Sequence, residues 1–210
     1  MLNADILTFH EFVMHETLPL SKIHGAVLEF LQGREDAVLF GAQAVNAYVA
    51  EPRATQDVYV MSSRAHEFSE ELRKHLSDLF HIAVRVREVA GGKGLRIYQV
   101  RKEGNRHLVD VRPVASFPKT QVFENIKVVS PDELIASKVT SHISRYGQSK
   151  GWTDRRDLTV LLLKFPELKT STGAVRSLLE QRNAEPAAIE LWEELVSTDL
   201  QIEVDDDLNF

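Results

Sequence analysis

The chain has 210 residues, of which 43% are hydrophobic and none is cysteine, and its formal net charge is −6. This length and apolar content suit one domain, or one domain with a helical appendage, and the lack of cysteine excludes disulfides and thiolate metal sites. No apolar run of about 18 residues occurs and no basic start precedes an apolar core, so we expect a cytoplasmic protein with no membrane span and no signal peptide.

The amino-terminal segment holds the pattern H-E-x-x-x-H from His10 to His15. A zinc-protease helix places its two histidines four residues apart on one face, and this pattern is one residue longer. We therefore interpret the segment as a surface helix or an arm. After it, apolar residues recur at helical spacing over residues 19–32, and Gly33 marks the end of this predicted helix.

Residues 38–61 carry the most informative stretch of the chain. A short apolar strand over 38–40 leads into a turn at Gly41 and then into a helix of small residues over 42–49. After a loop, a second strand begins at Gln56. The sequence therefore predicts a strand, a glycine turn, a helix and a strand in quick succession.

Valines and polar side chains alternate along this second strand. Val58 and Val60 point to one face, while Asp57 and Tyr59 point to the other, because strand side chains alternate with period two. The predicted strand therefore carries a carboxylate and a phenol on its polar face.

A charged amphipathic helix is predicted over residues 63–80, with Leu79 and Phe80 at the end of its apolar side. Two alternating apolar runs, 82–89 and 95–100, then flank a glycine-rich turn and predict a hairpin. This turn could instead cradle a phosphate. It lacks the G-x-x-x-x-G-K-[ST] spacing and no helix follows it, so we favour the hairpin.

A further strand is predicted over residues 106–114. Val109 and Val111 point one way, and Leu108, Asp110 and Arg112 the other. An acid in the middle of a strand is unfavourable unless it has a partner or lies at an edge. Asp110 is therefore a candidate site residue.

The second half of the sequence is helical. Residues 130–133 form a strong helix start, with a serine cap, a proline and a capping-box glutamate, and the helix carries Lys138 on the border of its apolar stripe. A second helix, capped by Thr153, places Asp154 and Asp157 in its first turn. Acids there are favoured by about 0.3–1 kcal/mol without any catalytic role.

Two more helices are predicted near residues 172–182 and 186–197. We expect a core of strands and helices over 1–130, including the amino-terminal helix. A helical region over 131–210 is expected to pack on this core.

In this order, these features resemble the minimal nucleotidyltransferase superfamily, and most closely its AbiEii-like branch. The resemblance rests on the strand-glycine-helix unit at Gly41, on R-x-T ending at Thr55, on the segment beginning at Asp57, and on LIASKVTSHISRYGQSKGWTDRRDL. It covers roughly residues 36–163. It implies an α+β fold of the DNA polymerase β type, with a mixed sheet flanked by helices and a C-terminal helical region.

The resemblance implies Mg²⁺-dependent transfer of a nucleotide from a nucleoside triphosphate to a hydroxyl acceptor. Metal ions neutralise the entering and leaving oxygens in such a transfer, and Mg²⁺ takes carboxylate, phosphate and water ligands. Asp57 and Asp110 correspond to metal ligands. Lys138 would contact nucleotide phosphate, and Asp154 or Asp157 would orient this lysine or assist the acceptor. The implied catalytic residues are Asp57, Asp110, Lys138, Asp154 and Asp157.

The resemblance also implies a nucleotide-binding set. Gly41 would let the backbone approach the triphosphate, and amides at the start of the following helix would hold the anion. The family has Gly or Ser where this chain has Ala42, and Gln43 could supply the missing polar contact. The implied nucleotide-binding residues are Gly41, Ala42, Gln43, Arg53, Thr55 and Lys138.

The chain departs from the family pattern at Tyr59, which stands where the family has its second carboxylate. A neutral phenol is a poor Mg²⁺ ligand, so either the metal site is weakened or another acid, such as Glu51 or Asp154, replaces the missing ligand. Two functions follow. One is an active nucleotidyltransferase, for example the toxin of a toxin–antitoxin or phage-defence system, and the other is an inactive protein that binds a nucleotide or a protein partner.

The implied partners are a nucleoside triphosphate, an RNA acceptor and an antitoxin protein. The net charge argues against a general coat of nucleic acid, although not against a local basic site. Four basic residues could meet RNA phosphates or simply form a solvated charged loop, and these are Arg145, Lys150, Arg155 and Arg156.

Overall fold

The computed structural model describes residues 16–50 and 52–201, so the H-E-x-x-x-H pattern and Glu51 lie outside the described residues. The chain divides into two compact units, with the boundary between Ser130 and Pro131. Among the described residues, no helix combines the length and the hydropathy that a membrane span requires.

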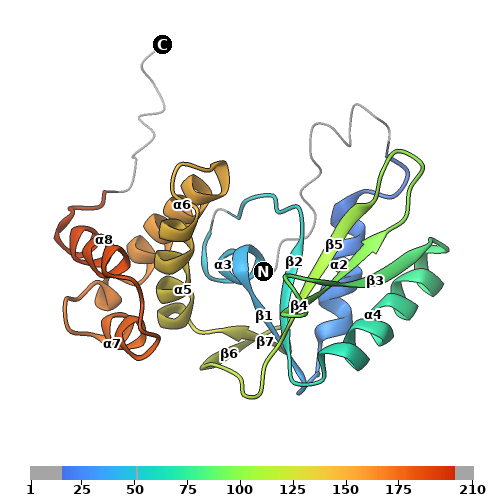
Figure 1. The fold of residues 1–210 in the computed structure, drawn as a ribbon, viewed down its shortest axis with the longest axis horizontal. Helices are drawn as coiled ribbons and strands as arrows, with labels where there is room; N and C mark the ends of the chain where they lie inside the picture. The colour runs from blue at the N-terminus through green and yellow to red at the C-terminus, as the bar shows by residue number, and fades with distance from the viewer. Residues whose placement is uncertain (1–15, 51, 202–210) are drawn as a thin grey trace, which may run out of the picture. The chain divides into compact units, whose positions relative to one another are not determined.

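The first unit is built on a mixed sheet (Figure 1). The seven strands within the described ranges are β1 (Ala37–Phe40), β2 (Val58–Ser62), β3 (Val84–Val89), β4 (Gly94–Gln99), β5 (Arg106–Pro113), β6 (Thr120–Phe123) and β7 (Ile126–Val129). Their order across the sheet is β3-β4-β5-β2-β1-β7-β6. β2 lies in the middle, antiparallel to β1 and parallel to β5, and β1 is also parallel to β7.

Alternation along the central strands separates an apolar face from a polar face. Val58 and Val60 are fully buried, and both lie opposite buried valines of β5. Tyr59 lies opposite Asp110 on the other face. The alternation predicted for both strands is therefore confirmed at their centres, and it positions the polar residues discussed below.

The helices of the first unit cover the sheet through apolar stripes. Within the described residues of this unit they are α2 (Leu20–Leu31), α3 (Gly41–Tyr48) and α4 (Ala65–Phe80). On α4, Phe68, Leu72 and Leu76 have no exposed area. The predicted stripe is one turn too long, because Leu79 is 50% exposed in the last turn before the helix ends.

Two hairpins complete the sheet. β3 and β4 pair antiparallel across the glycine-rich segment, where Gly91 and Gly92 have φ angles of 65° and 87°, so the predicted hairpin is confirmed. The β6–β7 hairpin was not predicted. Its two turn residues, Glu124 and Asn125, have φ angles of 49° and 65°, as a tight hairpin turn with the right-handed strand twist requires.

The second unit contains helices within its described part. They are α5 (Pro131–Ser144), α6 (Ser149–Lys164), the 3₁₀ helix η1 (Pro166–Leu168), α7 (Ala174–Gln181) and α8 (Pro186–Ser197). α5 packs against α6, α7 and α8, and Trp192 of α8 is fully buried.

The predicted start of α6 is wrong by one turn. The helix begins at Ser149, with Gln148 in extended conformation before it, and Thr153 lies inside it, where its hydroxyl donates to the Ser149 carbonyl at 3.1 Å. A threonine hydroxyl can satisfy a carbonyl one turn back as readily as it caps a helix, and the sequence does not distinguish the two. Asp154 and Asp157 are therefore not first-turn acids, and that explanation of them is wrong.

Candidate functional site

The loop before β2 is tied to α3 by side-chain hydrogen bonds. Gln43 Nε2 donates to Thr55 Oγ1 at 2.9 Å. Asn46 bonds both main-chain groups of Arg53, donating to its carbonyl at 2.8 Å and accepting from its N–H at 3.1 Å. Gln43, Arg53 and Thr55, predicted as nucleotide ligands, thus lie together, and these contacts fix the loop that delivers Asp57 to the sheet.

A β-bulge places His107 on the polar face. In a regular strand, residues 107 and 110 would point to opposite faces. The register between β4 and β5 shifts, so that Ile97 lies opposite Val109 while Tyr98 lies opposite His107. Leu108 is therefore the additional residue on β5, and the bulge turns His107 to the face of Asp110, as bulges commonly do next to sites.

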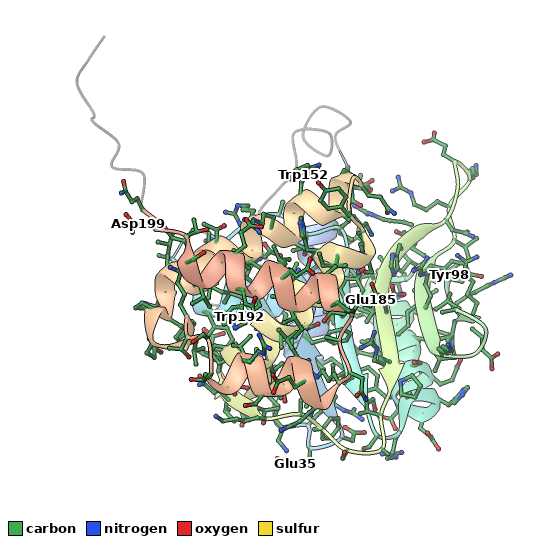
Figure 2. All side chains as sticks on the ribbon, turned by 60° about the vertical axis from the view of Figure 1, so that its left-hand side comes forward. Glu35, Tyr98, Trp152, Glu185, Trp192 and Asp199 are labelled. Atoms are coloured by element: carbon green, nitrogen blue, oxygen red, sulfur yellow. The ribbon has the colours of Figure 1, made fainter. Side chains whose placement is uncertain are left out.

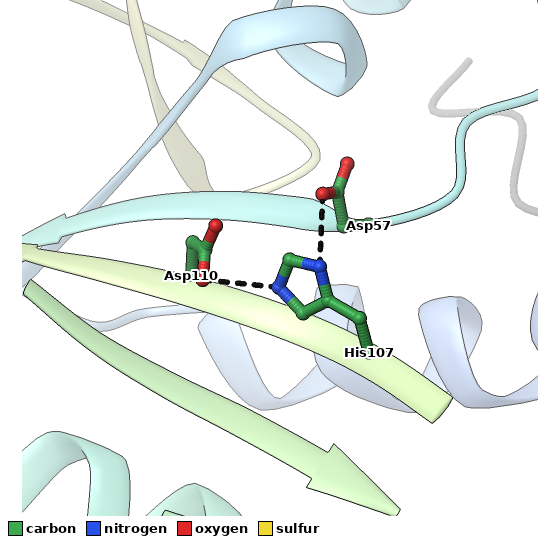
Figure 3. A group of neighbouring side chains, drawn as sticks. All are labelled: Asp57, His107 and Asp110. Atoms are coloured by element: carbon green, nitrogen blue, oxygen red, sulfur yellow. Dashed lines mark ion pairs between the residues drawn. The ribbon is translucent and has the colours of Figure 1, made fainter. Parts of the chain in front are cut away.

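His107 lies between the two predicted metal ligands (Figure 3). Its Nδ1 is 3.2 Å from Asp57 Oδ2, and its Nε2 is 3.0 Å from Asp110 Oδ1. Nε2 is buried, and it approaches Asp110 Oδ1 closely without the angles of a regular hydrogen bond. A neutral imidazole has one N–H, and only the protonated ring presents N–H groups to both carboxylates.

Arg96 holds Asp110 from the neighbouring strand. Its Nε and Nη2 donate to Oδ1 and Oδ2 of Asp110 at 2.8 and 3.0 Å, a bidentate pair between cross-strand neighbours. Burial alone would raise the pKa of Asp110, but the contacts from His107 and Arg96 outweigh it and lower this pKa to about 2. The Asp110 carboxylate is therefore ionised and engaged within the protein.

Tyr59 contacts both Asp57 and the glycine turn. Its hydroxyl donates to Asp57 Oδ2 at 3.0 Å, and Asp57 is 8% exposed. Gly41 has a φ of 75°, and a Cβ added to it would lie 3.0 Å from Tyr59 Cδ2. The phenol ring therefore covers the glycine that the resemblance assigns to the triphosphate.

The donor set fits Mg²⁺ poorly. One ligand atom each from Asp57, His107 and Asp110 lie within 4.8 Å of one another, which is close enough to share an ion. Mg²⁺ prefers an octahedron of oxygens, however, and here one donor is an imidazole, while both oxygens of Asp110 accept from Arg96. A ligand set of two carboxylates and an imidazole suits Mn²⁺ or Zn²⁺ better than Mg²⁺.

The other predicted catalytic residues lie together in the second unit. Lys138 Nζ is 2.7 Å from both Asp154 Oδ1 and Asp157 Oδ2, and Arg145 Nη1 is 3.0 Å from Asp154 Oδ2. The two aspartate side chains are 4% and 0% exposed and that of Lys138 is 10% exposed. This buried cluster links α5 to α6. The Lys138 ammonium binds two carboxylates of its own unit.

Two of the basic residues predicted to meet RNA are engaged elsewhere. Arg155 donates to Glu194 at 2.7 Å, and Arg156 lies 3.8 Å from Asp157. Lys150 is exposed, and the Arg145 side chain is 41% exposed beyond its bond to Asp154. The basic character of this region therefore rests on the exposed Lys150 and on the partly exposed guanidinium groups of Arg145 and Arg156, which are 41% and 42% exposed.

Sequence reasoning did not identify His107 or Arg96. The one local signal of the bulge is Leu108, an apolar residue that the regular alternation places on the side of Asp110, and this signal alone does not assign His107 to the polar face. The pairing of Arg96 with Asp110 could have been predicted from the sequence. Arg96 lies on the strand next to that of Asp110, and opposite charges are favoured in cross-strand pairs.

No protein-family model and no curated protein sequence matches the chain. Among solved structures, the Megavirus polyadenylate synthase is similar with a TM-score of 0.57 and 12% identity, over 76% of this chain and 36% of that chain. JHP933 from Helicobacter pylori gives 0.52 and 11% over 91% and 90% of the two chains. ANT(2")-Ia in complex with adenylyl-2"-tobramycin gives 0.50 and 13% over 84% and 100%.

These likenesses establish the fold. The chain has the α+β nucleotidyltransferase fold, as the sequence predicted. It covers little more than a third of the viral synthase, and all three identities are low. The AbiEii-like branch stays a prediction from the sequence motifs.

Proposed function

We propose that this chain is a binding protein built on the nucleotidyltransferase fold, and that it does not catalyse metal-dependent nucleotidyl transfer. The observation that carries the proposal is that protein side chains already engage both carboxylates, Asp57 and Asp110. Arg96 binds both oxygens of Asp110, His107 lies against both acids, and the Tyr59 hydroxyl donates to Asp57 at the position where the resemblance implies a further carboxylate. Two-metal transfer needs carboxylates that can bridge ions and substrate phosphates.

A metal ion at Asp57 and Asp110 would meet hydrogen bonds that these carboxylates already accept. The Arg96–Asp110 contact is bidentate and partly buried, and such contacts are among the stronger hydrogen bonds in proteins. A Mg²⁺ ion would compete with Arg96 and with the Tyr59 hydroxyl for these carboxylate oxygens, and it would find only two carboxylates among its ligands. The ring of Tyr59 over Gly41 further opposes approach of a triphosphate to the glycine turn.

The test compares Mg²⁺ and Mn²⁺ binding by calorimetry in wild type, Tyr59→Asp and Tyr59→Asn. Restoring the carboxylate should strengthen Mg²⁺ binding, while asparagine has nearly the same shape without the charge. Adding Asp57→Asn to the Tyr59→Asp variant should remove the gain. If Tyr59→Asp binds Mg²⁺ no better than Tyr59→Asn, the account of the missing ligand is wrong.

A parallel assay follows pyrophosphate release from each of the four nucleoside triphosphates, with Mg²⁺ and total RNA as the acceptor. We expect no release by the wild type above the level of its Asp57→Asn variant. Release by the wild type that Asp57→Asn abolishes would overturn the proposal.

A second function is favoured by one observation, the convergence of Asp57, His107 and Asp110 in a fold shared with a polyadenylate synthase and an adenylyl-tobramycin complex. In this function the chain moves a nucleotide from a triphosphate to a hydroxyl of RNA, protein or a small molecule, as an AbiEii-like toxin would. Growth arrest on expression, lost in Asp57→Asn and suppressed by a neighbouring gene, would support it together with the pyrophosphate assay.

A further inference from the structure

The α5–α6 turn, defined here as residues 145–152, joins the two helices, includes the first residues of α6 and exposes two aromatic rings. Tyr146 is 74% exposed and Trp152 is 62% exposed, and no other aromatic side chain among the described residues belongs to the exposed large apolar group. The second tryptophan of the unit, Trp192, is fully buried on α8 (Figure 2). Solvated aromatic rings this large are uncommon, and two in one turn point to a contact surface.

The turn holds these rings in place. His142 is buried, and its Nδ1–H donates to the Gly151 carbonyl at 2.8 Å. The His142 ring lies 6.0 Å from that of Tyr146 and 6.3 Å from that of Trp152, both in edge contact. Because Gly151 also lies directly against the Arg145 carbonyl, the turn has little freedom, and a ligand would meet rings that are already positioned.

The charge around the rings is positive. Arg145 and Lys150 lie in the same turn, and the only acid between residues 141 and 156 is Asp154. Its carboxylate is 4% exposed and bonds Lys138 and Arg145, so it adds little negative potential at the surface. A protein with a net charge of −6 thus presents two aromatic rings in a local basic setting.

We infer that this turn binds single-stranded nucleic acid, with bases stacked on Tyr146 and Trp152 and backbone phosphates at Arg145 and Lys150. Every base has a π face, so exposed rings bind unpaired strands with little sequence preference, and basic side chains follow the backbone. A duplex hides its base faces and cannot use the rings. The inference goes beyond the proposed function and rests only on the second unit, so it stands or fails independently of the Asp57 site.

The test measures binding of fluorescein-labelled oligouridine of about twelve nucleotides to the full chain by anisotropy, at low salt, with the matching DNA strand and an RNA duplex beside it. Trp152→Ala and Tyr146→Ala should each weaken binding of the single strands by about tenfold. Trp152→Phe should retain most of the affinity, because it keeps a ring. Val122→Ala, which removes an exposed apolar side chain of the first unit, should leave binding unchanged.

Intrinsic fluorescence gives an independent readout. Trp152 is solvated and Trp192 is fully buried, so stacking of a base should quench mainly Trp152. Equal affinity of wild type and the double alanine variant would overturn the inference, as would equal binding of duplex and single strands. Failure of the wild type to bind any strand would overturn it too. Comparing RNA and DNA of the same sequence shows which nucleic acid the protein prefers. Tighter binding of RNA would indicate a contact to the 2′-hydroxyl.

Discussion

Arg96 on β4 and Asp110 on β5 form a bidentate ion pair across the polar face of the sheet, with N–O distances of 2.8 and 3.0 Å. The hydrogen bond to Asp110 raises the pKa of Arg96, and Arg96 together with His107 lowers the pKa of Asp110 to about 2. Both groups therefore stay charged over the whole physiological range, and the pair is a permanent part of this face.

The Arg96–Asp110 pair should make stability depend on acid pH. Because the Asp110 pKa falls from 3.8 to about 2 on folding, its contribution is present above about pH 4 and is lost as the pH falls through about 2. The difference corresponds to about 2 kcal/mol, which solvent screening reduces to about 1 kcal/mol. His107 is the larger cause of the lowering and Arg96 the smaller, so urea unfolding of wild type and Arg96→Ala should differ by less than about 1 kcal/mol at pH 7.

The control for this prediction is Arg85→Ala, an exposed arginine on the adjacent strand β3. It should leave the unfolding free energy within experimental error of wild type at every pH. The difference between wild type and Arg96→Ala should shrink between pH 4 and pH 2. A difference that is constant with pH would mean that Arg96 acts through packing and not through its charge.

Lys138 should be required for folding stability without any nucleotide. Replacing it with methionine keeps the stem but leaves two buried carboxylates, Asp154 and Asp157, without their shared cation. Removal of one partner from a buried ion cluster costs about 3–5 kcal/mol, and the remaining contact of Arg145 with Asp154 favours the lower end. Urea midpoints of wild type, Lys138→Met and the exposed control Lys150→Met measure the loss.

A loss below about 1 kcal/mol in Lys138→Met would contradict the structural role, since surface ion pairs contribute only about that much. The lysine would then be available for the phosphate contact that the sequence resemblance implies. In that case the thermal midpoint of the wild type should rise with a nucleoside triphosphate, and the variant should lack the rise.

Gly151→Ala should destabilise the α5–α6 hairpin, although alanine normally favours a helix by about 1 kcal/mol over glycine. An added Cβ would lie 2.3 Å from the Arg145 carbonyl oxygen, a main-chain atom that cannot move away alone. We expect a net loss of about 2 kcal/mol, read from thermal or urea unfolding. Ser149→Ala, at an exposed position in the first turn of α6, is the matched control. A Gly151→Ala variant that is more stable than wild type would show that α5 and α6 can move apart to accept the added Cβ.

Much of the fold could be predicted because its signals are local. The apolar spacing predicted a helix over 19–32, and α2 runs from Leu20 to Leu31. Alternation and glycine turns likewise predicted β1, β2 and the β3–β4 hairpin. The β6–β7 hairpin was not predicted because β6 buries none of its side chains, so it has no apolar run, and because its turn, Glu124 and Asn125, contains no glycine.

The candidate site could be predicted only in part, because its decisive contacts join distant residues. Asp57 and Asp110 were identified as polar residues on strands, and the structure brings both to one imidazole. His107 reaches them through a bulge, which depends on how β4 and β5 pair and not on the local sequence. Similarly, the carbonyl contact at Gly151 is set by the packing of α5 on α6.

The contact between Gly41 and Tyr59 can be measured by a double-mutant cycle. Gly41→Ala introduces a Cβ at a φ of 75°, which costs about 1–2 kcal/mol, and also crowds the Tyr59 ring, whose nearest carbons would lie 3.0 and 3.2 Å away. In a Tyr59→Ala background only the cost of the positive φ angle at residue 41 should remain. The cost of Gly41→Ala in urea unfolding should therefore be smaller there by about 1 kcal/mol.

Tyr59→Phe is the matched background for this cycle, because it keeps the ring and removes only the hydroxyl that donates to Asp57. Gly41→Ala should cost as much in Tyr59→Phe as in wild type, since the crowding comes from ring carbons. Equal costs in Tyr59→Ala and wild type would show that the ring does not press on the glycine. Tyr59 would then not hinder the approach of a phosphate to the glycine turn, and only the lack of a carboxylate at position 59 would oppose the nucleotide site that the sequence resemblance implies.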